Sequence, residues 1–277
     1  MIKTGKYQKL EIGRLVEFGA YLREPGTTLP EVLLPARYLP ENPAVGSTID
    51  VFVYKDSEDR PVATTEHPYA TVGEFAFLEV AAVNATGAFL DWGLPKDLLV
   101  PYSEQRSKMR RGGIYLVYVY LDDATGRIVA SAKIDKFLGN VLPEYTPGDK
   151  VKALIYEHTE IGYKAIVDNL HRGMIYSNEL TEPLEVEQTV DAYVRQVRPD
   201  GKIDLTLRGE ARKRTDALAD RIMQYLRDGN STPIGDKSSP ELIGSIFGCS
   251  KKDFKQAVGH LYRARAIKIT PEGHITL

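Results

Sequence analysis

The feature that most constrains the fold is a repeat, because one stretch of the chain occurs twice and then a third time in fainter form. Residues 10–22 align without a gap with residues 78–90 at an offset of 68 positions, which pairs Gly19 with Gly87. A further offset of 75 positions places Gly162 under Gly87. Since a fixed-spacing repeat marks a chain built from copies of one structural unit, we expect three repeats. These are residues 1–69, 70–142 and 143–209.

Each repeat has the pattern of a set of short strands. Small and apolar residues alternate in runs such as residues 126–133, and turn residues at 122–126 and 199–201 connect the last two strands of a repeat. Glycine inside a strand pattern usually marks a bulge or a sharp bend in a closing sheet. About five strands in some 70 residues favour a small closed barrel over a sandwich, and the OB-fold is the simplest such barrel.

Motifs within the repeats resemble the S1 RNA-binding domain, which is an OB-fold. In repeat one the resemblance rests on Phe-Gly-Ala-Tyr-Leu at residues 18–22, Val-Leu-Leu-Pro at residues 32–35 and a basic strand that begins at Arg60. Repeat two carries it at residues 86–90, 98–101 and 127–131, and repeat three at Gly162, residues 173–177 and residues 202–207. The resemblance predicts three tandem S1-like barrels over about three quarters of the chain.

The S1 resemblance also implies which residues contact RNA. In that family, bases stack on aromatic side chains that flank the Phe-Gly-Ala-Phe turn, and a basic residue before the last strand meets the phosphates. An aromatic face can stack with any base for about 1–3 kcal/mol, and a nearby cation follows the backbone. The implied RNA-binding residues are Phe18, Tyr21 and Arg60 in repeat one, Phe89 and Arg127 in repeat two, and Lys164, Tyr176 and Lys202 in repeat three.

Departures from the S1 pattern leave a second interpretation open for the barrels. Thr86 replaces the first aromatic of repeat two, and repeat three lacks both aromatics. Residues 1–208 carry 24 Lys and Arg against 30 Asp and Glu, and an acidic surface repels a phosphate backbone. Repeats one and two could therefore be structural spacers in which Tyr21 and Phe89 pack against a neighbouring domain. The cations of repeat three bind RNA only if they gather on one face.

After residue 209 the hydrophobic period changes from two to about 3.6, the period of a helix. Residues 210–228 form one predicted helix, which Gly229 ends. Ser239 precedes a second helix with Pro at its first position, and Ser250 begins a third with a Ser-x-x-Asp cap. A hairpin follows at residues 266–277. These elements predict an α+β winged-helix domain over residues 210–277, in a chain that is multidomain and mostly β.

This carboxy-terminal domain is the basic part of the chain, with 12 Lys and Arg against 8 Asp and Glu in residues 209–277, although the net charge of the whole chain is −2. Helical spacing places one apolar face on the third helix, made of Phe254, Ala257, Val258, Leu261 and Ala264, and opposite it Lys252, Lys255, Gln256, Gly259 and Arg263. Gly259 costs the helix about 1 kcal/mol relative to Ala, which fits a helix surface that a binding partner must approach closely.

The basic face predicts phosphate contacts, although a merely solvated charged face is the alternative. The residues expected to make them are Arg208, Lys251, Lys252, Lys255, Arg263 and Arg265. Three S1-like repeats followed by Ser-Lys-Lys-Asp-Phe-Lys-Gln-Ala-Val-Gly-His-Leu-Tyr-Arg at residues 250–263 resemble the bacterial conserved virulence factor B family. That resemblance implies an RNA-binding protein that influences gene expression, and it does not identify the RNA target.

The sequence lacks the motifs that mark enzymes and metal-binding proteins. The five histidines show no metal-ligand spacing, no phosphate-binding loop or Gly-x-Ser-x-Gly motif occurs, and Cys249 is the only cysteine. We therefore expect no catalysis, no cofactor and no metal. No apolar run is long enough to span a membrane, and residues 1–9 lack the apolar core of a signal peptide, so we expect a cytoplasmic protein.

The expected function is non-catalytic binding of single-stranded RNA by a monomer, with the strand held between the third barrel and the winged helix. Two alternatives stay open. A winged-helix regulator of transcription would place residues 250–265 in the major groove of duplex DNA. A scaffold would use the acidic barrels to contact proteins of the ribosome or the polymerase. Preference for duplex DNA favours the regulator, and absence of nucleic-acid affinity favours the scaffold.

Overall fold

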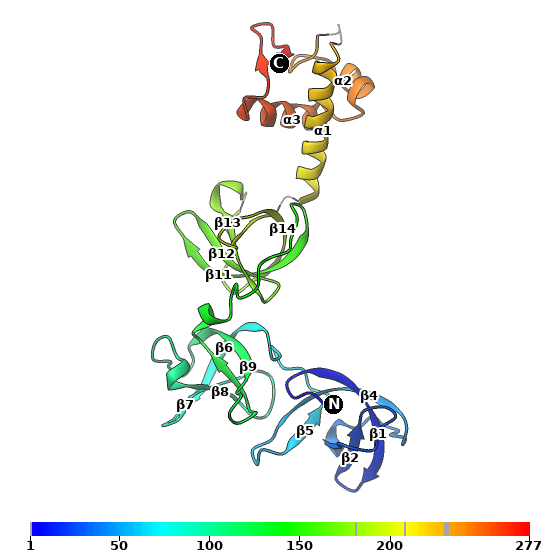
Figure 1. The fold of residues 1–277 in the computed structure, drawn as a ribbon, viewed down its shortest axis with the longest axis vertical. Coiled ribbons are helices and arrows are strands. Elements are labelled where there is room, and N and C mark those ends of the chain that lie inside the picture. Colours follow the sequence, from blue (N-terminus) through cyan, green and yellow to red (C-terminus); the bar gives the residue numbers. More distant parts are fainter. Residues whose placement is uncertain (1, 181, 208, 230–232) are drawn as a thin grey trace. The chain divides into compact units, whose positions relative to one another are not determined.

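The computed structural model describes residues 2–180, 182–207, 209–229 and 233–277, with only the backbone of residues 209–214. The described residues form three closed barrels of five strands each, followed by three α-helices and a two-stranded sheet (Figure 1). This confirms the predicted fold class. The chain divides into an N-terminal unit, Met1–Leu142 with Ile166–Arg172, and a C-terminal unit, Pro143–Ala165 with Gly173–Leu277.

All three barrels have the same strand order, in which the third strand pairs with the fifth and the first strand closes on the fourth. Barrel 1 consists of β1 (Tyr7–Val16), β2 (Gly19–Arg23), β3 (Val32–Pro35), β4 (Thr48–Lys55) and β5 (Pro61–Thr64). Barrel 2 consists of β6 (Phe75–Val83), β7 (Gly87–Leu90), β8 (Leu98–Pro101), β9 (Ile114–Leu121) and β10 (Ile128–Ser131). Barrel 3 consists of β11 (Lys150–Thr159), β12 (Gly162–Val167), β13 (His171–Tyr176), β14 (Thr189–Val197) and β15 (Ile203–Thr206).

The repeated glycines begin the second strand of each barrel, and in barrels 1 and 2 they do not lie at the bulges of the first strand, contrary to one expectation from their position. In barrel 1 the bulge falls in β1, between Ile12 and Arg14. A Cβ on Gly19 would lie 2.1 Å from the carbonyl oxygen of Leu34, and a Cβ on Gly162 would lie 2.2 Å from that of Ile175. Glycine is required here because the second and third strands approach each other too closely for any side chain.

Barrel 1 has a hydrophobic core of its own, and a second buried cluster joins it to barrel 2. Phe52 of barrel 1 is fully buried, and its ring meets Trp92 of barrel 2 at a centroid distance of 5.8 Å in an edge-to-face arrangement. Tyr54 and Val62 of barrel 1 belong to the same buried cluster as the interior of barrel 2. Since aromatic pairs of this kind add to the stabilisation from area burial, the two barrels pack as one body within the N-terminal unit.

The winged-helix elements form where their capping residues predict. They are α1 (Gly209–Arg227), α2 (Pro240–Phe247), α3 (Lys251–Arg263) and the hairpin of β16 (Lys268–Ile269) with β17 (Ile275–Thr276). The Ser239 hydroxyl accepts a hydrogen bond from Leu242 N at 3.2 Å, and the Ser250 hydroxyl accepts one from Asp253 N at 3.2 Å. Such caps satisfy amide groups that the first turn of a helix leaves unpaired.

One assignment on the third helix is wrong. Ala264 is exposed at the carboxyl end of α3, while Phe254, Ala257, Val258 and Leu261 are buried in the domain core. Ala264 is the C-cap, its amide still donates to the carbonyl oxygen of His260, and it lies beyond the turns of α3 that pack on the core. In the part of the chain that the structure describes, no helix is long and apolar enough to cross a membrane.

Candidate nucleic-acid interface

In barrel 1 the two predicted stacking aromatics lie next to each other. Phe18 is 58% exposed, and its ring meets the half-buried ring of Tyr21 edge to face at a centroid distance of 6.4 Å. The guanidinium of Arg14 lies 3.7 Å from the centroid of the Tyr21 ring and also forms an ion pair with Glu31 at 3.1 Å. The ring face on which a base would stack therefore already holds a cation.

Arg14 was absent from the expected site because nothing in the sequence links it to Tyr21. The two residues become cross-strand neighbours only through the register of β1 and β2, which shifts at the bulge between Ile12 and Arg14. A bulge re-aims the side chains that follow it. The alternation of apolar and polar residues in the sequence does not reveal a one-residue shift in the pairing of two strands.

The basic residue of barrel 1, Arg60, is engaged by carboxylates. Its Nε and Nη2 donate to Asp56 Oδ2 at 2.9 and 2.8 Å, and its Nη1 lies 2.9 Å from Glu58 Oε2. Burial raises the pKa of Asp56, but the hydrogen bonds from Arg60 outweigh this and lower the pKa below its ordinary value. Both acidic partners lie in the hairpin that precedes Arg60, so the pairing is local.

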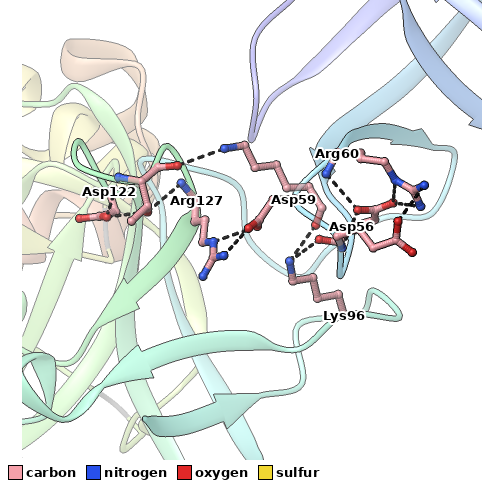
Figure 2. A network of polar contacts seen from close by, with 9 residues as sticks. Asp56, Asp59, Arg60, Lys96, Asp122 and Arg127 are labelled. Carbon is pink, nitrogen blue, oxygen red and sulfur yellow. Dashed lines mark hydrogen bonds and ion pairs between the residues drawn. The ribbon is translucent and has the colours of Figure 1, made fainter.

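The basic residue of barrel 2, Arg127, binds across to barrel 1. Its Nε donates to Asp59 Oδ1 at 2.8 Å, and a second guanidinium nitrogen contacts the other carboxylate oxygen (Figure 2). Lys55 donates to the carbonyl oxygen of Thr125 at 3.1 Å beside this pair. Hydrogen bonding and attraction from Arg127 lower the pKa of Asp59. Arg127 thus joins the two barrels of the N-terminal unit.

Phe89 lies on the same side of barrel 2 as Arg127. It is half-buried and lines a hollow of about 240 Å³ that Tyr54 and Lys55 of barrel 1 also line. Lys96, in the wall of this hollow, donates to the carbonyl oxygens of Lys55 and Asp56 at 3.2 and 2.5 Å. Burial lowers the pKa of this lysine. The surroundings of Phe89 agree with the interpretation that it packs beside a neighbouring domain.

In barrel 3 the cations form ion pairs with carboxylates. Lys164 lies 2.7 Å from Glu157, and Lys202 lies 2.8 Å from Asp200. The other paired cations of this barrel are Lys150 and Lys152 with Asp191, Arg172 with Asp135, Arg195 with Glu179, and Arg198 with Asp204. A strand of RNA must therefore compete with a carboxylate at each of them.

Tyr176 is held by a buried polar network that the sequence did not indicate. Its hydroxyl donates to Asp204 Oδ1 at 3.3 Å and contacts Arg198, while Gln196 donates to Asp204 Oδ2 at 2.6 Å. Asp204 is 3% exposed. Burial raises its pKa, but hydrogen bonds from Arg198 and Gln196 outweigh burial and lower the pKa below its ordinary value. The half-buried Tyr176 ring is thereby fixed in place.

The winged helix presents its cations differently. Lys252 is exposed and, among the described residues, makes no ion pair, while Lys251 is half-buried. Lys255 lies 3.0 Å from Asp236, and Arg263 Nε donates to the carbonyl oxygen of Gly259 at 3.1 Å. Arg265 is exposed just beyond the helix. Arg208, which was also predicted to bind phosphate, lies outside the described residues.

A hollow of about 470 Å³ lies within the C-terminal unit, between barrel 3 and the winged helix. Arg195 and Thr206 of barrel 3 line it from one side, and Arg263 of α3 lines it from the other. The remaining lining residues are Asn178, Glu179, Thr215, Asp216, Gln256, His260 and Ala264. Of the residues that sequence reasoning selected, only Arg263 is in this set. The sequence predicts that RNA is held between the third barrel and the winged helix, but most residues that line this hollow are not foreseeable from it, because they depend on how α1 joins the barrel to α3.

The described residues contain no group of three or more His, Cys, Asp or Glu side chains that could hold a metal ion. The hollow of the C-terminal unit contains side chains of both signs of charge, including the Arg195–Glu179 ion pair, and His260 Nδ1 lies 3.7 Å from Asp216 Oδ1. Chemically, this arrangement offers hydrogen-bond donors and acceptors, with one arginine, Arg263, that no carboxylate engages among the described residues.

Comparison with known proteins gives matches at both ends of the chain and over most of its length. A family model described as an S1 domain matches residues 4–66, and one described as a CvfB-like winged helix domain matches residues 220–277. The uncharacterized protein YitL of Bacillus subtilis strain 168 is 28% identical over 95% of this chain and 90% of that protein. Conserved virulence factor B of Staphylococcus epidermidis strain ATCC 12228 is 26% identical over 84% of this chain and 80% of that protein.

Among solved structures, a multidomain protein with nucleic acid binding domains from Streptococcus pneumoniae TIGR4 is 24% identical. The match covers 99% of this chain and 98% of that chain with a TM-score of 0.41.

Proposed function

Because the chain is a CvfB/YitL-like protein with an S1 domain and a CvfB-like winged-helix domain, we propose that it binds single-stranded RNA without catalysis and so influences gene expression. We place the binding surface in the C-terminal unit, where barrel 3 and the winged helix adjoin. OB-fold barrels bind single strands through grooves that carry cations and aromatic rings.

The observation that carries the proposal is the hollow of about 470 Å³ beside the basic face of α3. Arg263 lines this hollow and Lys252 is exposed on the same helix, so a strand lying along α3 meets two cations that are not engaged by carboxylates among the described residues. Phosphate neutralisation of this kind supplies the sequence-independent part of nucleic-acid affinity.

A single strand fits this surface better than a duplex does. A helix that reads duplex DNA must enter a major groove about 12 Å wide. On α3, however, Gln256, His260 and Arg263 already line a hollow that barrel 3 lines from its other side. An unpaired strand has the flexibility to follow such a hollow, whereas the two backbones of a duplex need open space on both sides of the helix.

The test is fluorescence anisotropy of the full chain with single-stranded RNA, single-stranded DNA and duplex DNA of equal length across a salt series. We expect preference for RNA, and affinity that falls with salt at a slope of about −0.7 per phosphate contact. Lys252→Glu/Arg263→Glu should weaken binding and make the slope shallower. The matched control is Lys108→Glu/Arg111→Glu, which reverses two exposed charges on barrel 2.

Each outcome separates the candidate functions. Preference for duplex DNA would replace the proposal with a winged-helix regulator of transcription. Flat isotherms with all three nucleic acids would leave a protein scaffold, and an equal loss of affinity in the control variant would mean that binding depends only on net charge.

A further inference from the structure

Gly259 lies in the middle of α3, where a glycine weakens the helix and has no packing reason to be present. A Cβ built on Gly259 meets no heavy atom within 4 Å, so the part of the chain that the structure describes leaves room there for a side chain. Gly235 shows the contrast, because its Cβ would lie 1.9 Å from the carbonyl oxygen of Gly273. Since glycine is a poor helix former, its presence at position 259 points to something outside the chain that needs the space.

Tyr262 lies three residues further along the same face of α3. It is 54% exposed, and among the described residues its ring contacts no other aromatic ring and no cation. Tyr225 of α1, by comparison, packs edge to face on Phe247 at 5.3 Å. Helical residues three apart are neighbours, and a helical side chain leans toward the amino end of its helix. The Tyr262 ring therefore borders the open surface over Gly259.

Cations flank this surface. Lys255 lies one turn before Gly259 and is 3.0 Å from Asp236, and Lys252 is exposed one turn earlier. Arg263 donates from Nε to the carbonyl oxygen of Gly259 at 3.1 Å, which holds its side chain beside the glycine without filling the space over it. We call the open surface over Gly259, bordered by Lys255, Tyr262 and Arg263, the Gly259 notch.

We propose that the Gly259 notch receives one unstacked nucleobase, which lies over the bare helix backbone and stacks on Tyr262 while Lys252 and Arg263 hold the adjoining phosphates. This inference deepens the proposed function and rests on it. A base inside a duplex has both faces covered by its neighbours, so only an unpaired base can use an aromatic ring in this way. The notch thus makes the winged helix itself a reader of single strands.

The test compares four single variants of the full chain. Tyr262→Ala should weaken binding of a fluorescein-labelled oligouridine about tenfold, which is within the range for loss of one base–aromatic stack. Tyr262→Phe should keep the affinity of the wild type, because stacking needs the ring and not the hydroxyl. Gly259→Ala should weaken binding several-fold while it raises the melting temperature, because Ala improves the helix and fills the notch.

Gly244→Ala is the matched control for Gly259→Ala. Gly244 lies inside α2, and a Cβ there also meets no heavy atom within 4 Å. We expect a similar rise in melting temperature with unchanged affinity. An oligouridine with one 2-aminopurine should also show fluorescence quenching on binding to the wild type and less quenching with Tyr262→Ala, which a purely structural role for Tyr262 would not produce.

The two proposals fail in different ways. If the wild type does not bind oligouridine or a mixed-sequence single strand at low salt, the proposed function fails and the notch proposal fails with it. If the wild type binds but Gly259→Ala and Tyr262→Ala bind equally well, only the notch proposal is overturned. The same holds if Tyr262→Phe loses as much affinity as Tyr262→Ala.

Discussion

The N-terminal barrels and the winged helix both carry basic residues that the sequence selects for RNA, but they differ in whether carboxylates engage those residues. Arg60 and Arg127 of barrels 1 and 2 are engaged by Asp56 and Asp59. Lys252 of α3 has no acidic partner among the described residues. A repeated motif therefore preserves the fold of the barrel without preserving the chemistry of its surface.

A chain of net charge −2 can carry a surface that attracts a polyanion, as our proposal requires. What attracts a phosphate backbone is the local field and not the sum over the molecule. Of the carboxylates that neutralise the two arginines, Asp59 also connects the barrels, since Arg127 of barrel 2 binds Asp59 of barrel 1 (Figure 2). The same residue types act as a structural joint in one region and as a binding surface, on our proposal, in the other.

The largest expected effect comes from truncating one core aromatic in each region. Phe52 and Phe254 are both fully buried, so Phe52→Ala and Phe254→Ala should each lower the free energy of unfolding by about 3–5 kcal/mol. Below the melting temperature of each variant, Phe52→Ala should keep the RNA affinity of the wild type, whereas Phe254→Ala should lose it. Urea unfolding and anisotropy measure both. Equal loss of RNA affinity in the two variants would mean that the N-terminal barrels matter for binding as much as the winged helix does.

A smaller loss of stability should follow from Asp204→Asn in barrel 3. The buried carboxylate accepts hydrogen bonds from Arg198 and Gln196, and losing its charge should lower the free energy of unfolding by about 2 kcal/mol. Because the folded-state pKa of Asp204 is lowered, its contribution is present above the ordinary pKa and is lost as the pH falls through the lowered value. The variant should therefore differ from the wild type at pH 7 and approach it in acid.

Asp200→Asn is the control, since its ion pair with Lys202 is exposed on both sides. It should change unfolding by urea very little at pH 7. A stability loss as large as that of Asp204→Asn would mean that burial does not distinguish the two carboxylates.

The barrels and the winged helix were predictable because their signals are local. Gly19 and Gly162 mark the point where two strands meet, and Ser239 and Ser250 cap helices at the predicted positions. The availability of the site residues was not predictable, because it depends on partners that strand register and domain packing supply. Arg127 meets Asp59 only once barrels 1 and 2 are assembled.

The same distinction explains the residues that were missed. Arg14 covers the Tyr21 ring through a register that shifts at a bulge, and Asn178 and Glu179 line the hollow of the C-terminal unit through the packing of barrel 3 beside α3. Tyr262 carried a signal that could have been read, since it falls on the basic face of α3 with Lys255 and Gly259 by helical spacing.

Freeing a cation in the N-terminal unit should change binding modestly. Asp59→Asn removes the carboxylate that engages Arg127, and an arginine without a carboxylate attracts phosphate more strongly. We expect RNA affinity at low salt to rise about two- to threefold, with the gain lost at high salt, because a single exposed charge is screened. Asp123→Asn, an exposed change in the neighbouring hairpin of barrel 2, controls for net charge. If both variants gain equally, Arg127 is not the cause.

The smallest effect concerns an exposed pair in barrel 3. Hydrogen bonds from Lys150 and Lys152 lower the pKa of Asp191 to about 2 from its ordinary value of 3.8. A lowered folded-state pKa means that the pair stabilises the fold above pH 3.8 and loses this effect as the pH falls toward 2. Wild type and Asp191→Asn should therefore differ slightly and constantly in urea midpoint above pH 5, and converge near pH 2. A difference that persists at pH 2 would show that Asp191 acts through something other than its charge, and Asp191 could then not be treated as a competitor of RNA for Lys150 and Lys152.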